Sequence, residues 1–148
     1  MAKAVAFGDP VAMTELCVAT DLSPAAAPAV ELAFRWAGAL QATLVLLHVV
    51  PDPELAPALG NDVPGDVAAA QRQLQQIAAA HGDVVCRVDV RAAEEVTATI
   101  VEASARAAYL FVGSHGRSGF QRLRLGSVAA AVLRKSQVPV VCLPPVGK

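Results

Sequence analysis

The chain has 148 residues, of which 55% are hydrophobic and 17% charged, and this length and composition fit a single domain over residues 1–148. Lys and Arg number 12 against 13 Asp and Glu, so the net charge of −1 gives no overall field that would gather nucleic acid or an anionic membrane. No apolar run approaches the ~18 residues of a membrane-spanning helix, and Asp9 interrupts the N-terminal apolar patch before a secretory signal forms. We therefore expect a cytoplasmic protein that does not insert into membranes.

The first half of the chain alternates apolar strands with helical patterns. The stretch ELCVATDL at 15–22 predicts a short apolar strand with turn residues behind it, and Ser23 followed by proline predicts the start of a helix over 24–40. The nearly continuous apolar run at 43–50 predicts a strand that is buried on both faces. After a loop rich in proline and glycine, a helical pattern follows at about 66–81.

The second half continues the same alternation. The run DVVCRVDV at 83–90 predicts a half-exposed strand, because apolar and polar residues alternate in it. A helix is expected at 94–107, an apolar strand at 109–113, a helix at 127–135 and a last strand, VPVVCL, at 138–143. The order of elements is then β-α-β-α-β-α-β-α-β.

This alternation predicts an α/β fold, a doubly wound five-stranded parallel sheet with helices on both faces, because strands joined by helices use right-handed crossovers. In such sheets a ligand binds beyond the carboxyl ends of the strands, where the winding reverses. Asp21 follows the first strand, and the long segment 113–127 follows the fourth. If the reversal lies between these two strands, Asp21 and the segment face one another across a crevice.

The segment that follows the fourth strand has the chemistry of a phosphate-binding loop. Gly113 and Gly116 would let the backbone approach a ligand without a Cβ atom in the way. Gly126 and Ser127 open the next helix, whose N–H groups and dipole attract anions. Arg117 adds a fixed positive charge close to the glycines. Together these residues predict a polyphosphate cradle.

The spacing of these residues separates the segment from the common nucleotide motifs. The chain has no Walker-type Gly-x4-Gly-Lys-Ser/Thr sequence and no G-x-G-x-x-G sequence after its first strand. It has instead G-x2-G-x9-G-S, together with VATDLS, LLHVV, VGSHGRSG and VPVV. In these motifs the chain resembles the universal stress protein family from about residue 15 to residue 143. The resemblance implies a Rossmann-like domain of the adenine nucleotide alpha hydrolase-like type.

The resemblance also implies a ligand and a set of binding residues. Asp21 would contact the ribose or the adenine side, Val49 would hold adenine through its backbone, and the phosphates would lie on the loop. Mg²⁺ or Mn²⁺ would neutralise the phosphate charge. The expected site consists of Ala19, Thr20, Asp21, Val49, Gly113, Ser114, His115, Gly116, Arg117, Gly126, Ser127 and Val128. The implied function is ATP binding by a nucleotide-dependent stress sensor or regulator rather than by a conventional enzyme.

Two other functions remain open from the sequence. The protein could be a slow ATPase or phosphoryl-transfer enzyme in which Asp21 or His115 positions water, or a nucleotide-independent interaction module. Simpler structural roles also exist: Asp21 suits a turn before a helix, and His48 suits a hydrogen-bonded, partly buried position better than a metal site. The three cysteines are far apart and predict small buried side chains rather than disulfides.

The last strand, at 138–143, is the expected contact of a homodimer. Pro139 cannot donate a ladder hydrogen bond and therefore belongs on an edge strand, and an apolar edge invites pairing with another chain. The other expected edge, at 83–90, carries Arg87 and Asp89, whose charges discourage pairing with another chain. The family resemblance likewise implies dimers built through the last strand.

Overall fold

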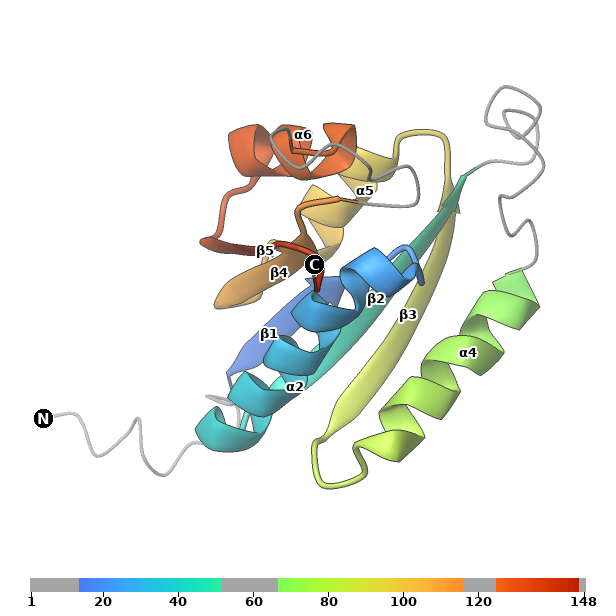
Figure 1. Ribbon diagram of the computed structural model, residues 1–148, viewed down its shortest axis with the longest axis vertical. Coiled ribbons are helices and arrows are strands. Elements are labelled where there is room, and N and C mark those ends of the chain that lie inside the picture. Colours follow the sequence, from blue (N-terminus) through green and yellow to red (C-terminus); the bar gives the residue numbers. More distant parts are fainter. Residues whose placement is uncertain (1–13, 52–66, 116–124, 147–148) are drawn as a thin grey trace, which may run out of the picture.

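The computed structural model describes residues 14–51, 67–115 and 125–146. These residues form a five-stranded sheet in which every pairing is parallel, with the strand order β3-β2-β1-β4-β5 (Figure 1). The strands are β1 (Glu15–Ala19), β2 (Thr43–Pro51), β3 (Cys86–Ala93), β4 (Tyr109–Gly113) and β5 (Val140–Leu143). The helices are the 3₁₀ turn η2 (Pro24–Ala26), α2 (Ala27–Leu40), α4 (Val67–Ala80), α5 (Val96–Ala103) and α6 (Ser127–Lys135). The predicted α/β fold class is confirmed.

Helices cover both faces of the sheet, as the alternation of the sequence predicts. Phe34 of α2 and Leu74 of α4 are buried in one core layer, while Ile100 of α5 and Val132 of α6 are buried in the other. Successive strand residues point to opposite faces, so Leu16 and Val18 of β1 join the first layer and Cys17 joins the second. Burial raises the pKa of the Cys17 thiol to about 12, so this cysteine stays neutral and serves as a small core side chain.

The winding of the sheet reverses between β1 and β4. From β1 the chain proceeds outward to β2 and β3, then crosses back to β4 on the other side of β1 and continues to β5. Strands β1 and β4 are therefore neighbours, with Ala19 opposite Val112 near their carboxyl ends. A crevice beside Asp21 was expected only if the winding reverses between these two strands, and the structure has that reversal.

Several predicted boundaries shift. The first strand ends at Ala19, before Asp21 as expected, and the chain turns immediately afterwards, with Leu22 in the left-handed region at φ 67°. The helix expected at 24–40 divides into η2 and α2. The third strand begins three residues later than expected, at Cys86, because residues 81–84 form turns, and the following helix, α5, is shorter than the predicted 94–107.

Candidate functional site

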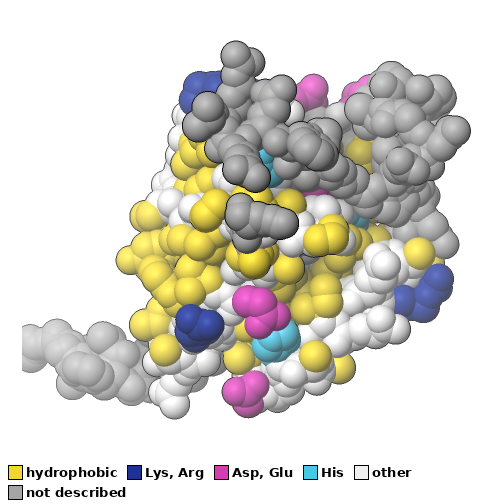
Figure 2. All heavy atoms as spheres, in the orientation of Figure 1, with side chains coloured by type: hydrophobic (Ala, Val, Ile, Leu, Met, Phe, Trp, Pro, Cys, Tyr) yellow, Lys and Arg dark blue, Asp and Glu magenta, His cyan; other side chains and the backbone are white. Residues whose placement is uncertain are grey.

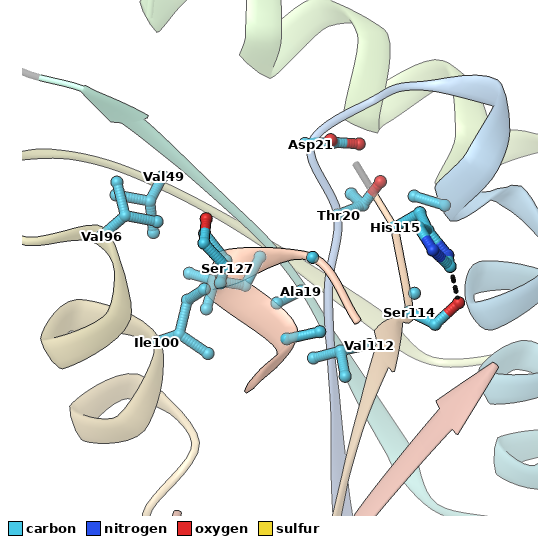
Figure 3. A pocket seen from close by; sticks show the side chains of 16 residues that line it. Ala19, Thr20, Asp21, Val49, Val96, Ile100, Val112, Ser114, His115 and Ser127 are labelled. Atoms are coloured by element: carbon cyan, nitrogen blue, oxygen red, sulfur yellow. Dashed lines mark hydrogen bonds between the residues drawn. The ribbon is translucent and has the colours of Figure 1, made fainter. Parts of the chain in front are cut away.

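A cavity of about 360 Å³ lies at the carboxyl ends of β1 and β4. Strand β2, the turn η2 and helices α5 and α6 contribute the remaining walls (Figure 3). The side chains and backbone around it belong to Ala19, Thr20, Asp21, Ala26, Leu47, Val49, Val96, Ile100, Val112, Gly113, Ser114, His115, Gly126, Ser127, Val128 and Ala129. The volume falls within the ~300–1,000 Å³ typical of small-molecule sites.

One wall of the cavity is apolar. It is formed by the carboxyl half of β2 and by α5, and Figure 3 shows Val49 beside Val96 with Ile100 below them. Val49 and Ile100 are only 8% and 5% exposed, so both also belong to the core layer under α5 and α6. A surface of branched aliphatic side chains suits the face of a flat, largely apolar ring.

A second part of the cavity lining is the N-terminus of α6. Gly126 is the N-cap in an extended conformation, and its own N–H donates to the Ser114 carbonyl oxygen at 2.7 Å. The first intrahelical bond runs from the Ala130 N–H to the Gly126 oxygen at 2.9 Å. The N–H groups of Ser127, Val128 and Ala129 therefore have no intrahelical acceptor, and the helix dipole adds positive potential there. Such a terminus favours an anion.

Asp21 lies in a tight turn that follows β1. Its Oδ1 atom accepts hydrogen bonds from both the N–H, at 2.9 Å, and the hydroxyl of Ser23. The Leu22 N–H donates to the Thr20 hydroxyl oxygen at 3.0 Å, and Leu22 adopts its positive φ between these two bonds. Asp21 thus has the structural turn role that its sequence context suggested, and it lines the cavity as well. Ser23 occupies the N-cap position of η2, but its side chain makes no capping hydrogen bond because its hydroxyl donates to Asp21.

Ser114 and His115 form the end of β4 at the cavity. The Ser114 N–H donates to the Leu143 carbonyl oxygen at 2.7 Å, which extends the pairing of β4 with β5 by one bond. The Ser114 hydroxyl and the His115 Nδ1 atom are 2.8 Å apart and share a hydrogen bond (Figure 3). Both side chains therefore take part in a small polar network at the start of the segment that leads to α6.

Gly113 has a packing role in addition to its place at the cavity. A Cβ atom there would lie 3.3 Å from the Ala26 Cα atom, 3.3 Å from the His115 oxygen and 3.4 Å from the Ala25 oxygen. All three atoms belong to backbone, so the absent side chain lets η2 approach the end of β4. The space that a Cβ atom would occupy is thus filled by the chain itself, and Gly113 also lines the cavity, as expected of a site residue.

The cavity gathers every predicted site residue that the structure describes, from Ala19 at the end of β1 to Val128 in α6. Gly116 and Arg117, which complete the predicted set, lie outside the described residues. Sequence reasoning did not identify the remaining lining residues, namely Ala26, Leu47, Val96, Ile100, Val112 and Ala129. These are alanine and branched aliphatic residues, and nothing in their pattern separates a cavity wall from ordinary core.

Metal clusters and membrane spans are both absent from the described residues. Within them, no group of three or more His, Cys, Asp or Glu side chains is arranged to hold a metal ion. None of their helices is both long and apolar enough to cross a membrane.

The fold and the cavity define the class of the protein: a doubly wound α/β domain with a ligand-sized cavity at its topological switch point. The model of the universal stress protein family matches residues 13–144. Universal stress protein Rv2005c from Mycobacterium tuberculosis is 34% identical over 129 residues, which are 84% of this chain and 43% of the relative. The chain belongs to the universal stress protein family, and it spans less than half the length of this relative.

Solved structures of the family have the same architecture. Universal stress protein UspA from Lactobacillus plantarum superimposes with a TM-score of 0.73 at 23% identity, over 88% of this chain and 97% of that chain. A universal stress protein in complex with cAMP superimposes with a TM-score of 0.66 at 28% identity, over 90% of this chain and 98% of that chain. The first likeness concerns the fold, and the second adds a family member that binds an adenine nucleotide.

Proposed function

We propose that this protein binds an adenine nucleotide, ATP in the first place, and acts as a cytoplasmic nucleotide-dependent regulator rather than as a conventional enzyme. One observation carries the proposal. A single cavity combines an apolar wall, which suits a base, with the N-terminus of α6, which suits phosphate. The family member solved with cAMP supports an adenine ligand for the same fold.

The apolar wall and the α6 N-terminus would bind different parts of the nucleotide. Adenine would lie against Val49 and Val96, and the phosphates would accept hydrogen bonds from the N–H groups of Ser127 and Val128. The Ser127 hydroxyl lies at the same terminus and offers a further donor. We expect Mg²⁺ or Mn²⁺ to enter with the phosphates, whose oxygens supply most of its ligands in nucleotide sites.

A pair of substitutions at Ser127 tests this assignment. Proline is accepted at the first position of a helix, and Gly126 already has the extended conformation that a following proline requires, with φ −61° and ψ 157°. Ser127→Pro therefore keeps α6 while it removes one N–H and the hydroxyl. Ser127→Ala removes the hydroxyl alone. Isothermal titration calorimetry of the wild type and both variants with ATP and with adenosine separates the two donors.

The expected result is a graded loss that is confined to the phosphorylated ligand. ATP affinity should fall about tenfold or more in Ser127→Pro and by less in Ser127→Ala, because a hydrogen bond to a charged group is worth roughly 1.5–3 kcal/mol. Adenosine affinity should be the same in all three proteins. Equal ATP affinity in the wild type and a folded Ser127→Pro protein would remove the α6 terminus from the site.

Hydrolysis is the less favoured alternative for this site. It would need Asp21 or His115 to orient water, whereas the Asp21 Oδ1 atom already accepts two hydrogen bonds from Ser23. The main role of the Asp21 carboxylate is therefore to stabilise the turn after β1. A regulator that retains its nucleotide fits these contacts better than an enzyme that turns it over.

We further propose that the protein forms a homodimer through its last strand. β5 is an edge of the sheet, and all four of its residues are half-buried. Hydrophobic side chains gather over β4, β5 and α2 on the face seen in Figure 2. An apolar edge of this kind is suited to pairing with the same strand of a second copy.

A further inference from the structure

The pairing of β1 with β2 follows a regular alternation up to the cavity. The Thr43 N–H donates to the Thr14 oxygen at 2.9 Å, and the Thr20 N–H donates to the Leu47 oxygen at 2.9 Å. The Leu44 N–H donates instead to the Val85 oxygen, at 2.8 Å, on the β3 side. Odd-numbered residues of β2 thus direct their backbone N–H and C=O groups toward β1, and even-numbered residues direct theirs toward β3.

The next bond of this ladder is replaced by a side chain. If the parallel pairing continued, the Thr20 carbonyl oxygen would accept from the Val49 N–H. The His48 Nδ1 atom lies 2.7 Å from that oxygen instead. Because a carbonyl oxygen can only accept, the Nδ1 atom carries the proton in this bond. The imidazole therefore takes the place of the backbone donor.

Because His48 binds the Thr20 oxygen, the N–H and C=O groups of Val49 point toward the β1 side at a position where β1 has already turned away. Within the described residues, neither the N–H nor the C=O of Val49 has a backbone partner on the β1 side. Val49 is only 8% exposed and lines the cavity, whereas His48 is 4% exposed and does not line it. A buried donor and acceptor of one residue are costly unless something binds them.

We propose that His48 is a positioning residue for base recognition: it caps the Thr20 carbonyl and so keeps the Val49 N–H and C=O available for a purine. This inference rests on the proposed nucleotide-binding function. A donor and an acceptor on one residue match the edge of adenine, whose N1 accepts and whose 6-amino group donates. Hypoxanthine has the reverse arrangement, because its N1 donates and its O6 accepts. Adenine binding by the Val49 backbone is what the family resemblance implies; the new element is that His48, through its bond to the Thr20 oxygen, maintains the selectivity for adenine.

Two substitutions of similar shape isolate the role of the ring. In His48→Asn the side-chain amide places a donor where Nδ1 stood, while His48→Leu has nearly the same outline without any donor. In His48→Leu the Thr20 oxygen should recover a donor from the Val49 N–H, which would close the ladder by one bond. Calorimetric titration of the wild type and both variants with ATP and with inosine triphosphate measures the consequence.

We expect the wild type and His48→Asn to bind ATP about tenfold more tightly than inosine triphosphate. His48→Leu should lose that preference through weaker ATP binding, with its inosine triphosphate affinity unchanged. If both nucleotides weaken together, or if His48→Leu keeps the preference, the positioning role is wrong. Absence of ATP binding in the wild type itself would overturn the proposed function, so the two failures are distinguishable.

Amide hydrogen exchange of the nucleotide-free proteins provides a second test that needs no ligand. The Val49 amide should exchange more slowly in His48→Leu than in the wild type or in His48→Asn, because it gains the Thr20 oxygen as a partner. An equally slow Val49 amide in the wild type would contradict the inference. If His48→Leu does not fold by circular dichroism, His48→Gln takes its place, since its amide lies farther from the backbone than Nδ1 does.

Discussion

At the scale of single residues, two glycines show how the surroundings decide the effect of one added carbon. Gly113 is enclosed by backbone atoms of η2 and of its own strand end, which would lie 3.3–3.4 Å from an added Cβ atom. Gly38 lies exposed in α2, where an added Cβ would meet the Val84 side chain at an ordinary 3.7 Å. The same substitution should therefore have opposite signs at the two positions.

We predict that Gly113→Ala lowers the free energy of unfolding by about 1–3 kcal/mol, because η2 must move away from β4. Gly38→Ala should raise it by about 0.5–1 kcal/mol, because alanine is the better helix former. Urea unfolding monitored by circular dichroism measures both changes. A Gly113→Ala protein as stable as the wild type would mean that η2 adapts without cost.

At the scale of elements, the order and type of the strands and helices follow from the sequence because apolar periodicity dominates them. The buried run of β2 and the alternating run of β3 each correspond to an observed strand. The boundaries were less predictable where local hydrogen bonds compete with regular structure. The turn at Asp21, in which Ser23 donates to the carboxylate, follows the end of β1 at Ala19 and separates η2 from β1.

The candidate site was predictable to a similar extent. Glycine and serine at fixed spacing after the fourth strand indicated a phosphate-binding loop, and the family resemblance added Asp21 and Val49 to the expected site. The apolar wall was not predictable, since Val96 and Ile100 face a cavity only once α5 is placed on the sheet. The bond from His48 to Thr20 could not be predicted either, because it depends on where β1 leaves the ladder.

At the scale of the whole molecule, the two edges of the sheet differ in chemistry. The β3 edge carries Arg91, which forms an ion pair with Asp89 at 3.0 Å and another with Glu102 at 3.3 Å. These charges discourage pairing with a second sheet. The β5 edge lacks such charges in its own sequence, VVCL. Self-association is therefore expected at β5.

A proline substitution tests this expectation. Odd-numbered residues of β5 direct their backbone N–H and C=O groups toward β4. This follows from two bonds, from the Leu110 N–H to the Pro139 oxygen and from the Ser114 N–H to the Leu143 oxygen. The Cys142 N–H therefore faces away from the sheet. Cys142→Pro removes this outward donor at an edge, where proline is tolerated. We predict that it weakens the dimer in sedimentation equilibrium at least tenfold, whereas Cys142→Ala leaves the dimer intact. Equal dimerisation of both variants would exclude β5 pairing.

Nucleotide binding at the carboxyl ends of β1 and β4 is the property on which the proposed function depends. The most direct measurement is calorimetric titration of the nucleotide-free wild type with ATP and Mg²⁺ at several temperatures, after the nucleotide released by denaturing freshly purified protein has been identified by mass spectrometry. We predict one site per chain with a dissociation constant in the micromolar range, about −8 kcal/mol. Absence of both released nucleotide and binding heat at every temperature would contradict the proposed function.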